Sequence, residues 1–278
     1  MTGSQTAVRS WCALLALIAA GTGCGRPLRQ PQDPRGAHFS VLTYNINYGG
    51  RLAGVSLAAI IGADADVVCL QETSPAWERY LRPRLKSKYP HCLFRHGRGA
   101  GGMAVFSRWA VRQVAWHKPR AGWFHGWVLR AGTPAGPVQI LSVHLRPPLG
   151  ENGRPGLGAM RRTRGVRLAE IVELEKMLDP AMPRIVLGDF NEEDNGRAVG
   201  HMVAQGFTNA LAEFDRRSDT WYWRAGPVLL NRRFDHVLYS KQLNCCRAEV
   251  IRAGASDHLP VRALFEKSGD RKTGITDG

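Results

Sequence analysis

The chain has 278 residues, 44% of them hydrophobic, which is enough for the core of one large domain or two small ones. This composition excludes a chain that is disordered along most of its length. Lys and Arg outnumber Asp and Glu by 38 to 23, so the formal charge is +15. Such a charge favours a partner that carries phosphate groups, although an arginine-rich composition can also give a basic surface without a ligand.

Residues 1–24 have the pattern of an export signal. Arg9 is the only charged side chain before an apolar run over 11–20, and small residues and then Cys24 follow. The run is too short to span a bilayer, which takes about 20 apolar residues. The segment ending at Cys24 is similar to a bacterial lipoprotein cleavage site, but Gly21 stands where that motif usually has Leu. We therefore expect export, either as a membrane-anchored lipoprotein with a lipid anchor at Cys24 or as a secreted or periplasmic protein.

The rest of the chain divides into a tether, one domain and a tail. Residues 25–37 are rich in Pro, Gln, Arg and Gly, which predicts a flexible tether. Over 38–266, short apolar runs alternate with amphipathic stretches, which predicts a domain of mixed α and β structure, and 267–278 form a polar tail. We expect strands over 39–46, 66–71, 102–107, 126–130, 138–145, 184–188, 234–239, 248–252 and 260–265, and helices over 52–62, 75–87 and 158–178.

The helix predicted over 158–178 has an unusual distribution of charge. Arg161, Arg162, Arg164 and Arg167 all lie in its first half. Positive charge near the start of a helix is unfavourable for the helix dipole. It would suit an anion bound nearby.

Polar side chains stand at the edges of six predicted strands. They are Asn45, Gln71 with Glu72, His144, Asp189 with Asn191, Asp235 with His236, and Asp257 with His258. Each one alone is explained by a turn, a helix cap or a buried structural role. The set contains more carboxylates, amides and histidines than caps require, so it predicts an assembled functional site.

These residue types predict metal-assisted hydrolysis of a phosphate ester. Oxygen ligands without a cysteine partner suit Mg²⁺, Mn²⁺ or Ca²⁺ better than zinc. Carboxylates alone repel a phosphate, so a divalent ion is needed to screen them and to stabilise the transition state. A histidine held by an aspartate stays protonated more easily and can donate a hydrogen bond to a phosphate oxygen.

Seven short motifs follow one another along the chain. They are Thr-Tyr-Asn-Ile-Asn (43–47), Leu-Gln-Glu (70–72), Gly-Met-Ala-Val-Phe-Ser-Arg (102–108), Ser-Val-His-Leu (142–145), Gly-Asp-Phe-Asn (188–191), Arg-Phe-Asp-His-Val (233–237) and Ser-Asp-His-Leu-Pro-Val (256–261). In this order they resemble the endonuclease/exonuclease/phosphatase superfamily, which includes deoxyribonuclease I, neutral sphingomyelinases and inositol polyphosphate phosphatases. The resemblance covers about residues 39–265. It implies an α+β fold, a four-layer α/β/β/α sandwich of two packed mixed β-sheets flanked by helices, as in deoxyribonuclease I.

The resemblance also implies roles for the strand-edge residues. Glu72 matches the principal Mg²⁺ ligand, with Asn45 and Asp257 as further ligands or orienting groups. Asp189 would orient or deprotonate the attacking water, and Asn191 would hold that water or a phosphate oxygen. Asp235 would pair with His258 at the scissile phosphate, and His144 matches a histidine that binds phosphate or acts as an acid.

Three departures from the family pattern bear on the substrate. His144 stands where the abasic-site endonuclease branch usually has a tyrosine, which disfavours that branch. Glycines at 99, 101 and 102 occupy the region where deoxyribonuclease I supplies a supporting glutamate to its histidine. Met103 replaces an asparagine that many members carry, so one phosphate contact is expected to be missing.

The sequence is compatible with more than one class of substrate. The basic charge favours a nucleic acid or an anionic headgroup. The candidate substrate-binding residues are Asn47, Trp221, Arg224 and Arg233, and the aromatic residues of an expected substrate-facing loop over 221–224 can stack on bases or sugars. Trp123, Phe124 and Trp127 form either a lipid-touching turn or part of the core. We therefore expect a monomeric nuclease-type phosphodiesterase, with a sphingomyelinase-like or other phospholipid or small-molecule phosphoesterase as the alternative. A non-catalytic binding module is disfavoured, because a decayed site should have lost part of the set.

Overall fold

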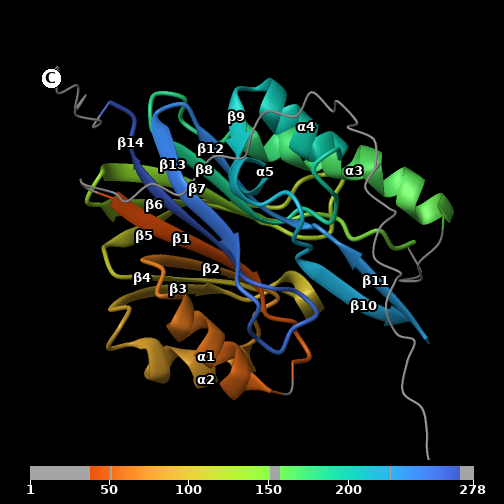
Figure 1. Ribbon diagram of the computed structural model, residues 1–278, viewed down its shortest axis with the longest axis horizontal. Helices are drawn as coiled ribbons and strands as arrows, with labels where there is room; N and C mark the ends of the chain where they lie inside the picture. Colours follow the sequence, from red (N-terminus) through yellow and green to blue (C-terminus); the bar gives the residue numbers. More distant parts are fainter. Residues whose placement is uncertain (1–37, 51, 151–156, 226, 270–278) are drawn as a thin grey trace, which may run out of the picture.

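Two six-stranded β-sheets pack face to face, and helices cover their outer faces (Figure 1). The computed structural model describes residues 38–50, 52–150, 157–225 and 227–269. The predicted leader and tether, and most of the predicted tail, lie outside the described residues. The expected four-layer α+β sandwich is confirmed. None of the described helices is long and apolar enough to cross a membrane.

The first sheet has the strand order β13-β14-β1-β2-β4-β3. Its strands are β1 (His38–Asn45), β2 (Val67–Gln71), β3 (His91–Arg95), β4 (Met103–Ser107), β13 (Leu243–Val250) and β14 (Val261–Lys267). β1 and β2 are parallel, because helix α1 (Ala53–Ala63) carries the chain back between them. Asn45 at the end of β1 therefore lies beside Gln71 at the end of β2.

The second sheet has the strand order β5-β6-β7-β8-β12-β9. Its strands are β5 (Val111–His117), β6 (Gly126–Thr133), β7 (Gly136–His144), β8 (Arg184–Asp189), β9 (Phe207–Asn209) and β12 (Asp235–Ser240). Helix α3 (Leu157–Glu175) connects the parallel pair β7 and β8, so that His144 and Asp189 lie side by side at their carboxyl ends. A separate two-stranded ribbon, β10 (Trp221–Ala225) and β11 (Val228–Arg232), extends from the body of the domain (Figure 1).

Alternating side chains of the central strands build three layers of core. In β1, Val41 points into the core between the sheets, and the next residue, Leu42, packs beneath α1 and α2 (Pro75–Leu85). In β7, Ile140 faces the core between the sheets, and Leu141 packs beneath α3 and α4 (Arg197–Ala204). Apolar residues on both faces are what a strand needs when it is covered on both sides.

The predicted elements agree with the structure best where the strands are central. All three predicted helices are present within three residues of the expected ends. The sequence did not reveal α4, α5 (Ala210–Phe214), β3, β5, β9 or β11, and β13 begins five residues before the predicted 248–252 strand. β5 and β13 lie at sheet edges and contain bulges, at Gln113/Ala115 and Cys245/Arg247, so their polar and apolar residues do not alternate regularly. The expected loop over 221–224 is instead strand β10.

Candidate active site

The carboxyl ends of β1, β2, β7 and β8 meet at one edge of the sandwich. Gln71 Nε2 donates a hydrogen bond to Ser142 Oγ at 3.3 Å, which joins the two sheets directly behind this edge. Parallel strands present the residues after their last paired positions to the same side. For this reason, Asn45 and Asp189, which are 144 positions apart in the chain, come into contact here.

Asn45 connects two of the carboxylates. Its amide Nδ2 donates to Glu72 Oε1 at 3.0 Å and to Asp189 Oδ2 at 3.1 Å. Its Oδ1 accepts from the backbone N–H of Asn47 at 3.1 Å. Because a backbone N–H can only donate, this contact turns the amide nitrogen toward the carboxylates. Asn45 is therefore an orienting residue in this arrangement.

Glu72 is held by groups that leave it open on one side. Its Oε2 accepts from the backbone N–H of Tyr48 at 2.9 Å, and its side chain is 20% exposed. The backbone of Glu72 has a φ of 61°, and Asn47 and Asn191 have φ of 61° and 52°. Non-glycine residues in this left-handed region are uncommon and gather at functional sites. Three of the four such residues in the described chain belong to this cluster.

Asp189 is placed by an unusual backbone at the end of β8. The preceding Gly188 has a φ of 142°, and a Cβ at this position would lie 2.0 Å from the carbonyl oxygen of Val143 on β7. Only glycine permits such a close approach between the strands. Asp189 Oδ1 then accepts from the backbone N–H of Asn191 at 2.8 Å, which leaves Oδ2 directed at the centre of the cluster.

Asp235 and His258 form the deepest pair of the site. His258 Nδ1 bonds to Asp235 Oδ2 at 2.8 Å, and His258 Nε2 lies 3.6 Å from Asp189 Oδ2. Burial alone would lower the pKa of His258, but the charges of Asp235 and Asp189 more than offset it and raise the pKa to about 10. His258 is therefore a cation at neutral pH.

Asp189 has a perturbed acidity of its own. Its complete burial raises its pKa, because a charged carboxylate loses its hydration there, while the nearby His258 and His144 act in the opposite direction. A carboxylate with a raised pKa is a better proton acceptor than an ordinary one. Asp189 thus has the properties of a general base.

His144 completes the group around Asp189. Its Nε2 lies 3.5 Å from Asp189 Oδ2 and 3.9 Å from Glu72 Oε1. Its other nitrogen, Nδ1, is buried and has no hydrogen-bond partner in the part of the chain that the structure describes. The ring instead stacks on Phe124, with ring centroids 4.2 Å apart and an interplanar angle of 20°.

Asp257 lies on the far side of the Asn47 turn. Its Oδ1 accepts from Asn47 Nδ2 at 3.0 Å, and its Oδ2 accepts from Trp221 Nε1 at 3.3 Å. The backbone carbonyl of Asp257 also accepts from the N–H of Tyr222 at 2.8 Å. These contacts join the base of the β10–β11 ribbon to the site, so Asn47, Trp221 and Asp257 all belong to it.

Two of the predicted substrate-binding residues are not brought into this group. Arg224 is exposed on β10, on the ribbon face opposite to that of Trp221. Arg233 is 5% exposed, and its guanidinium donates to the carbonyl of Ser218 at 3.0 Å and to Asp194 Oδ2 at 3.0 Å. Arg233 thereby anchors two loops, and two of its guanidinium nitrogens, Nε and Nη1, are hydrogen-bonded to protein.

The aromatic segment before β6 is not a free lipid-touching turn. Trp127 is 1% exposed and packs in the core between the sheets. Trp123 covers the guanidinium of Arg146, whose Cζ lies 3.2 Å from the ring centroid, and Phe124 covers His144. Phe124 comes from a loop outside all of the motifs, and none of them indicates its contact with His144.

Two sets of side chains are compatible with a divalent cation. The first set is Asp189, Asp235 and His258, each of which offers one possible ligand atom, and these three atoms lie within 4.8 Å of one another. In that set, however, His258 Nδ1 is already bonded to Asp235, and the three groups form a compensated ion-pair cluster. Glu72 and Asp257 instead present partly open carboxylates on either side of the Asn47 turn, a donor set that fits a hard cation such as Mg²⁺. We therefore favour Glu72 and Asp257 as the metal ligands.

Comparisons with known proteins identify the family and agree with the fold. A family model described as Endonuclease/Exonuclease/phosphatase family matches residues 42–258. No curated protein matches the chain. Among solved structures, the fold is similar to TDP2 from C. elegans, with 18% identity, 82% of this chain and 75% of that chain covered, and a TM-score of 0.63.

Two further structures have the same fold. An endonuclease/exonuclease/phosphatase protein from Beutenbergia cavernae is 18% identical, with 83% of this chain and 72% of that chain covered and a TM-score of 0.61. D. rerio TDP2 complexed with a single-strand DNA product is 17% identical, with 83% of this chain and 99% of that chain covered and a TM-score of 0.63. At these identities the similarity is one of fold.

Proposed function

Because the chain belongs to the endonuclease/exonuclease/phosphatase family, whose members are typically phosphoester hydrolases, we propose that it is a divalent-metal-dependent phosphodiesterase of the nuclease type. One observation carries this proposal: three nitrogen atoms converge on Asp189 Oδ2. Asn45 Nδ2 lies 3.1 Å from it, and Nε2 of His144 and of His258 lie 3.5 and 3.6 Å away. Such a group combines a proton acceptor with donors for a phosphate at a single point.

In the proposed mechanism, Asp189 accepts the proton of a water molecule whose oxygen attacks the phosphorus. The raised pKa of Asp189, which results from its burial, favours this transfer. Asn191 holds the water through its Oδ1, because its Nδ2 is already bonded to the carbonyl of Leu145 at 3.0 Å. His258, protonated by its contact with Asp235, donates to a non-bridging phosphate oxygen.

The remaining residues act on the leaving side and on the cation. His144 Nε2 protonates the departing ester oxygen as the P–O bond breaks. Glu72 and Asp257 would hold Mg²⁺, Mn²⁺ or Ca²⁺, and Asn45 would orient Glu72. When bound, such an ion would neutralise charge on the phosphate and stabilise the transition state.

A nucleic-acid substrate is favoured by charge and by the position of Trp221. The formal charge of +15 attracts polyanions, and the Trp221 ring, stacked on Phe234 at 5.0 Å, borders Asp257 where a base could stack. The D. rerio TDP2 structure contains a single-strand DNA product, and a DNA substrate for this chain is proposed by analogy.

A phospholipid substrate is the second candidate, and one observation favours it. Trp223, Leu229 and Leu230 are 53%, 51% and 41% exposed on the β10–β11 ribbon next to the site. Exposed apolar residues on a projecting ribbon can contact a lipid surface. Together with the export signal that the sequence predicts over residues 1–24, this arrangement also fits a monomeric enzyme that works outside the cytoplasm.

The test uses the purified chain with Mg²⁺, Mn²⁺, Ca²⁺ or EDTA. Its substrates are bis(4-nitrophenyl) phosphate, plasmid DNA, RNA and sphingomyelin vesicles. We expect metal-dependent turnover of the phosphodiester and of one nucleic acid, and loss of both with Glu72→Ala. The proposal is rejected if all four substrates remain intact, or if Glu72→Ala equals the wild type.

A further inference from the structure

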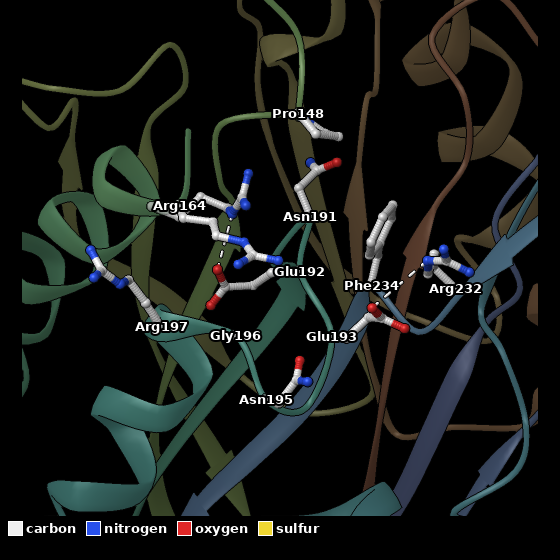
Figure 2. A pocket seen from close by; sticks show the side chains of 11 residues that line it. Pro148, Arg164, Asn191, Glu192, Glu193, Asn195, Gly196, Arg197, Arg232 and Phe234 are labelled. Carbon is white, nitrogen blue, oxygen red and sulfur yellow. Dashed lines mark hydrogen bonds and ion pairs between the residues drawn. The ribbon is translucent and has the colours of Figure 1, made fainter. Parts of the chain in front are cut away.

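A concave pocket adjoins the candidate active site, between α3, the start of α4 and the base of the β10–β11 ribbon (Figure 2). Its charged lining residues are Arg164, Arg167, Arg197, Arg232, Glu192 and Glu193. Its volume is about 160 Å³. Pockets for whole small molecules usually have about 300–1,000 Å³, so this one suits a single chemical group of a larger ligand.

Arg167 and Glu192 neutralise each other inside the wall of this pocket. Arg167 is 3% exposed, and its Nε donates to Glu192 Oε2 at 3.0 Å. Glu192 Oε1 also accepts from the N–H groups of Ala198 and Val199, so it caps the start of α4. The charges of this pair thus offset each other, and neither residue determines the charge offered to a ligand.

The exposed arginines leave the pocket positive. Arg232 Nε lies 3.7 Å from Glu193 Oε2, a distance typical of a weak, solvated ion pair. Arg164 and Arg197 are exposed and have no ion-pair partner in the part of the chain that the structure describes. Figure 2 shows Arg164 and Arg197 on one side of the pocket and Arg232 on the other, beyond Phe234.

Asn191 connects this pocket to the catalytic group. It lines the pocket, and its backbone N–H donates to Asp189 Oδ1 at 2.8 Å. Phe234, another lining residue, stacks on Trp221, whose Nε1 bonds to Asp257. A group bound in the pocket would therefore lie next to a phosphoester held at Asp189.

We propose that this pocket binds a second phosphate of the substrate, one that is not cleaved, through Arg164 and Arg197. The guanidinium groups can donate paired hydrogen bonds to phosphate oxygens. This inference rests on the proposed phosphoesterase function and narrows its substrate to molecules with at least two phosphates. A neighbouring nucleotide phosphate and a phosphorylated inositol headgroup both supply this chemistry.

Binding of bisphosphates and monophosphates to the full chain tests the proposal. The nucleotide pair is thymidine 3′,5′-bisphosphate against thymidine 5′-monophosphate, and the headgroup pair is myo-inositol 1,4-bisphosphate against myo-inositol 1-phosphate. Titration calorimetry in EDTA gives a Kd for each without turnover. We expect the bisphosphate of at least one pair to bind about tenfold tighter, which is the order expected for added charge-assisted hydrogen bonds. The pair that shows the preference identifies the source of the phosphate.

A charge-matched pair of variants assigns the preference to the pocket. The tenfold ratio between the Kd values of the monophosphate and the bisphosphate corresponds to about 1.4 kcal/mol. In Arg164→Gln/Arg197→Gln the two Kd values should come within about twofold of each other, because the arginines that contact the second phosphate are absent. Arg79→Gln/Arg112→Gln removes the same charge from exposed positions on α2 and β5 and should retain the tenfold ratio. Equal binding of bisphosphate and monophosphate in both pairs overturns the proposal, as does a preference that survives in the pocket variant.

Turnover of bis(4-nitrophenyl) phosphate, which has one phosphate, separates this inference from the proposed function. A chain that turns it over without any bisphosphate preference would keep the function and lose the second-phosphate site. A chain that prefers the bisphosphate but hydrolyses no phosphoester would keep the pocket as an anion site and lose both the function and the assignment of the pocket to a substrate.

Discussion

The ring of Phe124 lies parallel to the ring of His144, with centroids 4.2 Å apart, and supports a histidine whose buried Nδ1 has no partner in the described chain. Gly101 makes room for it: a Cβ at position 101 would lie 3.2 Å from Phe124 Cδ1. The glycine-rich segment that departs from the deoxyribonuclease I pattern therefore accompanies a different support for the histidine, by stacking in place of a carboxylate.

Loss of this stack should reduce catalysis while leaving substrate binding intact. An aromatic pair contributes about 0.5–1.5 kcal/mol beyond burial, so we expect kcat of Phe124→Ala to fall roughly tenfold with little change in KM. Phe124→Tyr keeps the ring and should restore most of kcat. Steady-state kinetics across a pH series checks this, because a purely structural role would lower the amount of folded enzyme without changing the pH profile. Equal kcat for Phe124→Ala and wild type contradicts the positioning role.

The ion pair between Asp235 and His258 should make stability depend on pH. The pKa of His258 is raised to about 10 in the folded chain, from an unfolded value near 6.5, by Asp235 and Asp189 acting against burial. Its contribution is therefore fully present below about pH 6.5 and is lost as the pH rises toward about 10. Urea unfolding over this range should give a falling free energy of unfolding.

Asp235→Asn is the variant that checks this dependence. It removes the largest source of the raised His258 pKa, while Asp189 remains 3.6 Å from the ring. We expect a lower free energy of unfolding at neutral pH and a flatter decline toward pH 10 than in the wild type. If the free energy of unfolding declines with pH equally steeply in the two proteins, a group other than His258 causes the pH dependence.

Removal of the Glu72 charge should abolish metal binding. Glu72→Gln keeps the size of the side chain but loses its charge, and we expect turnover to fall roughly 100-fold or more, because a metal supplies several kcal/mol of transition-state stabilisation. Glu249→Gln is the control, since Glu249 pairs with Arg247 and Arg262 on the first sheet. Titration of each protein with Mn²⁺ is the measurement. If Glu72→Gln binds Mn²⁺ as tightly as the wild type, the metal ligands would be Asp189, Asp235 and His258 instead.

The polar ends of the central strands could be predicted because they are local features of the sequence. Glu72, His144 and Asp189 each follow an apolar run, and the parallel pairing of their strands brings such ends together. Phe124 could not be predicted, because nothing in its own segment shows that it lies on a ring 20 residues later. Arg233 and Arg164 show the same limit. Only the fold shows that Asp194 and Ser218 engage Arg233, while Arg164 is exposed and lines a pocket.

The lipid anchor inferred from residues 1–24 predicts that Cys24 is needed for attachment to the membrane. If Cys24 is lipidated, Cys24→Ser should move the protein from the membrane fraction to the soluble fraction of the cell that produces it, since lipid chains supply the attachment. Cys92→Ser, which changes a cysteine of the folded domain, is the control. Identical fractionation of Cys24→Ser and wild type would leave ordinary secretion as the better interpretation.

Gly188→Ala should damage the fold where the site is built. Gly188 has a φ of 142°, and an alanine Cβ would lie 2.0 Å from the carbonyl oxygen of Val143, so the parallel pairing of β7 and β8 must shift. We expect a loss of about 3 kcal/mol or more in the free energy of unfolding, which is at the upper end for a single substitution. Gly132→Ala is the matched control, since its nearest neighbour would be 3.7 Å away. Urea unfolding monitored by tryptophan fluorescence should separate the two variants, and similar stabilities would mean that β8 tolerates a side chain here and that glycine does not set the position of Asp189.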